Sequence, residues 1–167
     1  KLKLRNKFIS VNTPKIFSQE KINVKKCLDT GWISSEGKYV KKFEESFAKY
    51  NRRIYGVAVS SGTAALEIGM KSLNLKKGDE VIIPSFTIIS TALCVIKLGL
   101  KPVLVDSDIY TWNMDPDLVI KKITKKTKAI MFIDYGGNPS DINKILKIGK
   151  KYGLKIIQDG AQSLGAR

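Results

Sequence analysis

The sequence contains no histidine, and its 167 residues include only two cysteines, Cys27 and Cys94. Without histidine, this segment cannot carry Ser-His-Asp or Cys-His catalysis, and most zinc chemistry is excluded with them. The two cysteines lie far apart with no paired spacing, so neither a metal site nor a disulfide framework is predicted. We expect both to be small, buried hydrophobic residues.

Long hydrophobic runs are also missing. No stretch approaches the roughly 20 apolar residues of a membrane-spanning helix. The N-terminal KLKLRNKFIS has no apolar signal-peptide core behind its charges. The hydrophobic share of 43% is still enough to bury the core of one ordinary domain. We therefore expect a cytoplasmic protein with no membrane partner.

Arginine is scarce, although the net charge is +15. Only Arg5, Arg52, Arg53 and Arg167 are present, and the lysines are scattered over segments such as KKITKKTK. Arginine forks and interleaved aromatic residues, which commonly read and stack nucleic-acid bases, are missing. The charge therefore favours a solvated lysine-rich face. A surface that binds polyanions remains the alternative.

What the sequence does contain is a regular alternation of short apolar segments and helical patterns. Helices are predicted near residues 19–28, 38–50, 63–73, 87–99, 115–123 and 140–153, and strands at 55–61, 78–85, 101–106, 128–134 and 154–159. Short strands that are apolar throughout and separated by helices are typical of a parallel sheet covered on both faces. The predicted fold class is α/β, with a three-layer, mainly parallel sheet flanked by helices.

Unusual chemistry follows three of the predicted strands, in SSGTAAL, PSFTIIST and QDGAQS. In parallel sheets, ligands bind beyond the carboxyl ends of the strands. Ser61, Gly62 and Thr63 would begin a helix, whose free amides and hydroxyls can bind a phosphate without lysine. A plain helix cap is the alternative for these residues, because the segment is neither a Walker loop nor GxGxxG.

Asp159 stands at the end of the last predicted strand, where an unpaired carboxylate is costly to bury. A pyridinium nitrogen would be a suitable partner, because an ionised carboxylate keeps that ring protonated. Alternatively, Asp159 caps the turn that follows.

The motifs also occur in a familiar order. TGWISSEGKYVKKFEESFAKY, VAVSSGTAALE, GDEVIIPSFTIISTA, KPVLVD, TWNMDP, ITKKTKAIMFIDYGGNP and IIQDGAQSLGA follow one another with the spacing of the DegT/DnrJ/StrS nucleotide-sugar aminotransferases. From about Val11 onward, the chain resembles this family and is most similar to perosamine-synthase-like members. The resemblance implies the aspartate aminotransferase fold and a pyridoxal 5'-phosphate cofactor.

The resemblance also implies roles for individual residues. Gly62 and Thr63, with Ser61 adjacent, would hold the cofactor phosphate, and Asp159 would pair with the pyridine nitrogen. Gln162 resembles the family glutamine near the phenolic oxygen of the cofactor. Trp32, Ile33 and Ser34 resemble the segment that borders the substrate pocket, with core packing of Trp32 as the alternative.

Three positions depart from the family pattern. Ile88 replaces the usual aromatic residue that stacks on the cofactor ring. Gln158 stands where relatives commonly have glutamate, and no meaning is assigned to it. Residues 134–137 read DYGG, where many relatives have a histidine before YG.

The lysine that forms the Schiff base in the family is expected beyond Arg167, so no catalytic residue is assigned within this segment. The chain is expected to be the N-terminal part of a longer enzyme. It would comprise an arm and helix over residues 1–35 and, over residues 36–167, an incomplete large domain of a fold-type I enzyme, inactive in isolation.

The function implied by the resemblance is the transfer of an amino group, by family likeness from glutamate, to a nucleotide-linked keto-deoxysugar such as a 4-keto-6-deoxyhexose. A homodimer is expected for the complete protein. A pyridoxal-phosphate-dependent sugar dehydratase of the same family is one alternative, because some members replace the lysine by histidine. A non-catalytic basic α/β module that binds nucleic acid is the other.

Overall fold

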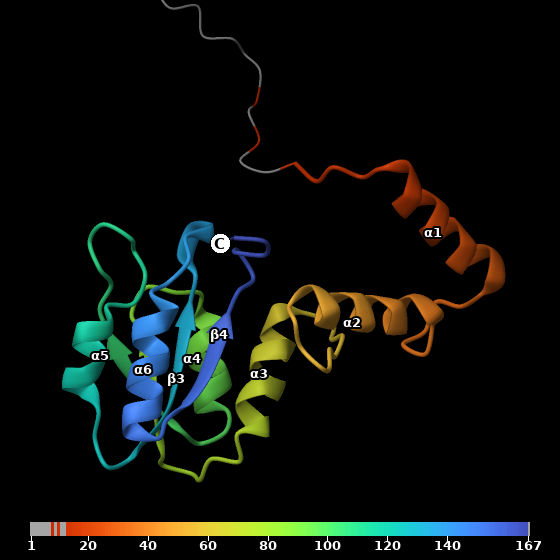
Figure 1. The fold of residues 1–167 in the computed structure, drawn as a ribbon. Coiled ribbons are helices and arrows are strands. Elements are labelled where there is room, and N and C mark those ends of the chain that lie inside the picture. Colours follow the sequence, from red (N-terminus) through yellow and green to blue (C-terminus); the bar gives the residue numbers. More distant parts are fainter. Residues whose placement is uncertain (1–7, 9, 11–12, 167) are drawn as a thin grey trace, which may run out of the picture. The chain divides into compact units, whose positions relative to one another are not determined.

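A computed structural model describes residues 8, 10 and 13–166 of the chain (Figure 1). Their contacts form two compact units with the boundary between Ala58 and Val59. The resemblance implies a different boundary, between an arm that ends at residue 35 and a large domain that begins at residue 36. That boundary stays a prediction. None of the helices in the described part of the chain is long and apolar enough to cross a membrane.

The first unit contains two helices, α1 (Ser18–Thr30) and α2 (Lys38–Tyr50), which confirm the helices predicted near residues 19–28 and 38–50. Helix α1 ends where Gly31 adopts a left-handed φ of 70° and donates its N–H to the carbonyl of Leu28. Helix α2 begins directly after Gly37. Both helix ends were therefore marked by glycines in the sequence.

The strand predicted at residues 55–61 is wrong, because no strand is assigned there. A strand is defined by hydrogen bonds to a neighbouring strand, and the described residues provide none for this segment. The side chains of Tyr55 and Val57 are 84% and 74% exposed. An apolar sequence alone does not supply the pairing partner that a strand requires.

The second unit is a four-stranded parallel sheet in the order β2-β1-β3-β4. The strands are β1 (Glu80–Pro84), β2 (Lys101–Val105), β3 (Thr127–Ile133) and β4 (Lys155–Asp159). The helices are α3 (Gly62–Ser72), α4 (Ile89–Ile96), α5 (Pro116–Lys122) and α6 (Ile142–Tyr152), with the 3-10 turn η1 (Tyr135–Gly137) after β3. The predicted α/β class and parallel sheet are confirmed.

Successive strand residues point to opposite faces of the sheet, so each face has its own core. On one face, Val81 and Met131 pack with α3 and α4; on the other, Ile82 and Phe132 pack with α5 and α6. Figure 1 shows α6 and α4 on either side of β3. The predicted three-layer arrangement is therefore confirmed. The helix that begins at Gly62 therefore packs against the sheet whose strand β4 ends at Asp159.

The two cysteines differ in their surroundings. Cys94 is fully buried in the core that α3 and α4 cover, as predicted. Cys27, on α1 in the first unit, is only half-buried, so the prediction that it is a buried residue is wrong. None of the side chains of helix α1 is buried.

Candidate functional site

The carboxyl ends of β1, β3 and β4 lie at one edge of the sheet, because the three strands are parallel. Ile82 is opposite Ile130, which places the end of β1 beside the end of β3, and Ile133 is opposite Asp159 at the end of β4. Two strand spacings, about 10 Å, therefore separate the ends of β1 and β4. Side chains that follow these strands can reach one small ligand.

The first turn of α3 lies at the same edge. The side chain of Ser61 caps the helix by accepting the N–H of Ala64 at 3.2 Å, so the cap expected at this position is confirmed. The amides of Gly62 and Thr63 belong to the unpaired first turn, where helix N–H groups point outward. A Cβ built on Gly62 has no atom within 4 Å, so a ligand can approach the backbone there.

A contact between two hydroxyls places this turn relative to β1. The Oγ1 of Thr63 lies 2.8 Å from the Oγ of Ser90, which is the second residue of α4. Helix α4 follows β1, so the contact brings the start of α3 to the carboxyl end of β1. Sequence reasoning did not select Ser90, although its position near a helix start after a strand was a usable signal.

Asp159 closes β4 at the same edge. Its Oδ1 accepts the N–H of Ala161 at 3.1 Å, so the predicted role in capping the turn is confirmed. No hydrogen bond from the described residues reaches its Oδ2. The cap therefore holds the carboxylate in place and leaves one oxygen for a ligand, so the two sequence-based interpretations are compatible.

Gln162 lies in the turn after Asp159 and contacts η1. Its Oε1 accepts the N–H of Gly136 at 2.7 Å. Gly137 lies directly against the backbone of Gln162, because a Cβ at Gly137 would lie 3.0 Å from that carbonyl oxygen, and its φ is 82°. The side-chain NH2 of Gln162 keeps both of its donors free of acceptors from the described residues.

A buried carboxylate lies beside this turn. Asp134 is 2% exposed and accepts hydrogen bonds from the N–H of Ser140, the amide of Gln158 and the hydroxyl of Ser163. Burial raises the pKa of Asp134, but these hydrogen bonds lower it more, so its pKa lies below the ordinary value of 3.8. The sequence marked Gln158 and residues 134–137 as departures from the family pattern, and the structure joins them in one contact.

Ile88 directly precedes α4, forms no capping hydrogen bond with its side chain, and is 60% exposed. Like Ser90, Ile88 follows strand β1, so both residues lie at the edge of the sheet where β1 ends. Its aliphatic side chain can cover a flat ring by dispersion but cannot stack on it as an aromatic ring does.

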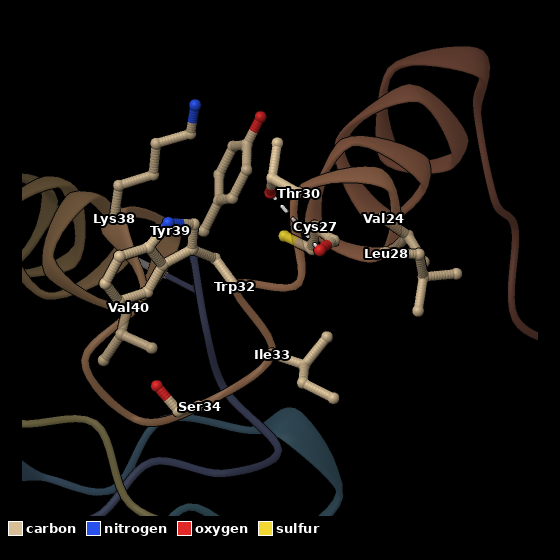
Figure 2. A pocket seen from close by; sticks show the side chains of 11 residues that line it. Val24, Cys27, Leu28, Thr30, Trp32, Ile33, Ser34, Lys38, Tyr39 and Val40 are labelled. Carbon is tan, nitrogen blue, oxygen red and sulfur yellow. Dashed lines mark hydrogen bonds between the residues drawn. The ribbon is translucent and has the colours of Figure 1, made fainter.

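Trp32, Ile33 and Ser34 belong to the first unit and lie between α1 and α2. They line an apolar hollow of about 320 Å³, together with residues of both helices such as Cys27 and Tyr39 (Figure 2). Trp32 is 59% exposed, so the alternative of core packing does not hold in this unit. The assignment of the three residues to a substrate pocket stays a prediction.

The edge of the second unit provides complementary groups for a phosphorylated pyridine. Free amides and hydroxyls at the start of α3 suit a phosphate, and the free oxygen of Asp159 suits a protonated ring nitrogen. Both lie at one edge of one sheet, as the resemblance requires. The geometry therefore fits the cofactor expected from the sequence, without any metal ligand set among the described residues.

Comparison with known proteins gives the same result. The chain is 41% identical over 161 residues to a GDP-perosamine synthase of Escherichia coli O157:H7, covering 96% of this chain and 44% of that protein. It is 39% identical to the GDP-perosamine synthase of Caulobacter vibrioides, covering 95% and 43%. The chain thus spans less than half the length of these curated relatives.

A solved structure supports the fold as well. The crystal structure of a GDP-4-keto-6-deoxymannose-3-dehydratase with a trapped PLP-glutamate geminal diamine matches with a TM-score of 0.89 and 32% identity. The match covers 95% of this chain and 42% of that one. The family model that describes the sequences of the DegT/DnrJ/EryC1/StrS aminotransferase family matches residues 14–167. The resemblance seen in the motifs is thereby confirmed, and the chain belongs to the DegT/DnrJ/EryC1/StrS aminotransferase family.

Proposed function

We propose that the protein containing this chain is a pyridoxal-phosphate-dependent aminotransferase that transfers an amino group to a nucleotide-linked 4-keto-6-deoxyhexose. The observation that carries the proposal is the placement of Thr63 and Asp159 at one edge of the sheet in a chain of this family. The relatives named GDP-perosamine synthase support the substrate class. The glutamate trapped with PLP in the dehydratase structure supports glutamate as the donor.

In this proposal, the start of α3 binds the phosphate of the cofactor. The amides of Gly62 and Thr63 would donate to phosphate oxygens, and the hydroxyls of Ser61 and Thr63 would add further donors. The positive end of the helix dipole favours the phosphate charge. Ile88 would cover one face of the ring.

The ring itself would be oriented by the turn after β4. Oδ2 of Asp159, which no hydrogen bond from the described residues reaches, would accept the N–H of the pyridine ring and keep that nitrogen protonated. The NH2 group of Gln162 would donate to the phenolic oxygen. When bound, the protonated cofactor withdraws electrons from the carbon that carries the transferred nitrogen.

A sugar dehydratase is the second candidate, because the matched structure with a TM-score of 0.89 is named as one. The two functions have different products. An aminotransferase converts glutamate and the keto sugar into 2-oxoglutarate and an amino sugar, whereas a dehydratase removes a hydroxyl group from the sugar as water. Incubating the full-length protein with GDP-4-keto-6-deoxymannose and glutamate, followed by mass spectrometry of the sugar, would distinguish them.

The role of Asp159 provides a direct test. In the full-length protein, Asp159→Ala should weaken the affinity of the apoprotein for pyridoxamine 5'-phosphate and abolish most amino transfer, because the ring nitrogen loses its anionic partner. Asp117→Ala is a matched control, since Asp117 is an exposed carboxylate in the first turn of α5. Turnover and affinity near the wild-type values in Asp159→Ala would overturn the proposal.

The partners beyond the substrates also belong to the proposal. We expect the full-length protein to form a homodimer, as the sequence resemblance implies. Sedimentation of the full-length protein would measure this state. A monomer at micromolar concentration would contradict the expectation.

A further inference from the structure

Asp134 is a buried carboxylate to which the proposed function gives no role. It is 2% exposed, and no lysine or arginine of the described chain lies within ion-pair distance of it. Burying an unpaired carboxylate is costly unless several hydrogen bonds compensate. Its three donors are the Ser140 amide at 2.9 Å, Gln158 Nε2 at 2.7 Å and Ser163 Oγ at 2.7 Å.

Two of the three donors enclose the segment that would face the cofactor. Gln158 directly precedes Asp159, and Ser163 directly follows Gln162. Both bind the same oxygen, Oδ2 of Asp134. A single buried atom therefore holds the two ends of the turn at residues 159–162.

The backbone reinforces this link. The N–H of Asp134 donates to the carbonyl of Asp159 at 3.2 Å, which continues the pairing of β3 and β4 to their ends. Neighbouring side chains in a strand point to opposite faces. Holding the Gln158 side chain on one face therefore fixes the direction in which Asp159 points on the other.

We propose that Asp134 is a positioning residue that, through Gln158 and Ser163, holds Asp159 and Gln162 in the orientation that faces the pyridine ring. This inference rests on the proposed function and adds to it a residue that does not touch the cofactor. The Gln158 amide is the partner that the Asp134 carboxylate requires, because an amide NH2 donates and a carboxylate only accepts. A glutamate at position 158 would instead oppose two carboxylates at this contact.

Exchanging the carboxylate at position 134 and the amide at position 158 tests the inference. In the full-length apoprotein, Gln158→Glu should weaken the affinity for pyridoxamine 5'-phosphate by about tenfold, by analogy with the loss of a hydrogen bond that orients a metal ligand. Asp134→Asn should also weaken it. The double variant Asp134→Asn/Gln158→Glu restores one amide and one carboxylate at the contact, so it should recover most of the affinity.

A spectroscopic measurement separates positioning from simple destabilisation. The 15N chemical shift of the ring nitrogen in labelled pyridoxamine 5'-phosphate reports its protonation, so it should move in Gln158→Glu and return in the double variant. Asp141→Ala is the control, because Asp141 caps α6 and its side chain forms no hydrogen bond or ion pair with residues 158–163. This control should lower the melting temperature and leave the affinity and the 15N shift unchanged.

These experiments distinguish failure of the positioning role of Asp134 from failure of the proposed function. If Asp159→Ala weakens cofactor binding while Gln158→Glu and Ser163→Ala bind as the wild type, only the positioning role is overturned. If Asp159→Ala also binds as the wild type, the proposed function and the inference both fail. Should Asp134→Asn not fold, Ser163→Ala removes one donor from the same oxygen, and its affinity decides the question.

Discussion

The hydroxyls of Thr63 and Ser90 lie 2.8 Å apart and join the first turns of two helices that are far apart in the sequence. A hydroxyl can donate one hydrogen bond and accept two. When Ser90 donates to Thr63, the hydroxyl hydrogen of Thr63 remains free for another acceptor. The pair therefore suits the phosphate end of the proposed site.

Replacing Thr63 by valine should remove this donor while keeping the shape of the side chain. Because a hydrogen bond to a charged group contributes about 1.5–3 kcal/mol, the affinity of the apoprotein for pyridoxamine 5'-phosphate should fall by about tenfold or more. Ser90→Ala should cause a smaller loss. Titration with pyridoxamine, which lacks the phosphate, is the control, and an equal loss for both ligands would show that Thr63 does not bind the phosphate.

Ile88 offers the opposite kind of test, because a substitution there should improve binding. Ile88→Phe places an aromatic ring at a position that is 60% exposed. Stacking should add about 0.5–1.5 kcal/mol, which tightens the affinity for pyridoxamine 5'-phosphate by up to about tenfold. Ile89→Phe adds the same surface one residue later and should have little effect; equal gains in both variants would refute stacking by residue 88.

The stability of the protein should depend on the ionisation of Asp134. Because the folded protein holds the pKa of Asp134 below its ordinary value of 3.8, its contribution to stability is complete above that value and is lost as the pH falls through the lower, folded pKa. Asp134→Asn should therefore be destabilised at neutral pH. The difference in the free energy of unfolding between Asp134→Asn and the wild type should shrink in acid.

Chemical unfolding of wild type and Asp134→Asn between pH 7 and pH 2 would measure this difference. Asp141→Asn removes a charge from an exposed carboxylate in the same segment but keeps a side-chain oxygen that can cap α6, so its difference in stability from the wild type should be small and change little with pH. Parallel curves for wild type and Asp134→Asn over the whole range would mean that the Asp134 carboxylate does not stabilise the fold.

Cys94 should be inert toward thiol reagents. Burial, and then the nearby charge of Glu67, raise the pKa of Cys94 to about 11, so the reactive thiolate is scarce at neutral pH. In a Cys27→Ser background, peptide mapping after iodoacetamide treatment at pH 8 should find Cys94 unmodified until denaturant unfolds the core. Rapid modification of the native protein would contradict its burial.

Much of the fold follows from local signals. A helix was predicted near residues 115–123, where Asp115 and Pro116 are a typical cap and first-turn proline, and the structure shows Asp115 accepting the N–H of Asp117 at 2.8 Å. The helix predicted near residues 140–153 closes with a glycine, and the structure shows Gly153 ending α6 with a φ of 66°. These signals act within three or four residues, so they can be interpreted without the tertiary structure.

Pairing between distant segments was harder to predict. The apolar run at residues 55–61 suggested a strand, but the described chain supplies no neighbour to pair with it. Ser90 was overlooked because its partner, Thr63, is 27 residues away. Gln158 had no assigned meaning until the structure placed its amide on Asp134, 24 residues earlier.

Apart from the strand wrongly predicted at residues 55–61, the sequence by itself determined the order of strands and helices, most helix ends and the residue types at the strand ends, because these depend on periodicity and on caps a few residues long. Only the tertiary structure decided which of those strand ends meet and which side chains support them. The register of β3 against β4 places Ile133 opposite Asp159 and so brings Asp134 beside the turn that follows. Such contacts depend on the packing of the whole sheet, which no short stretch of sequence encodes.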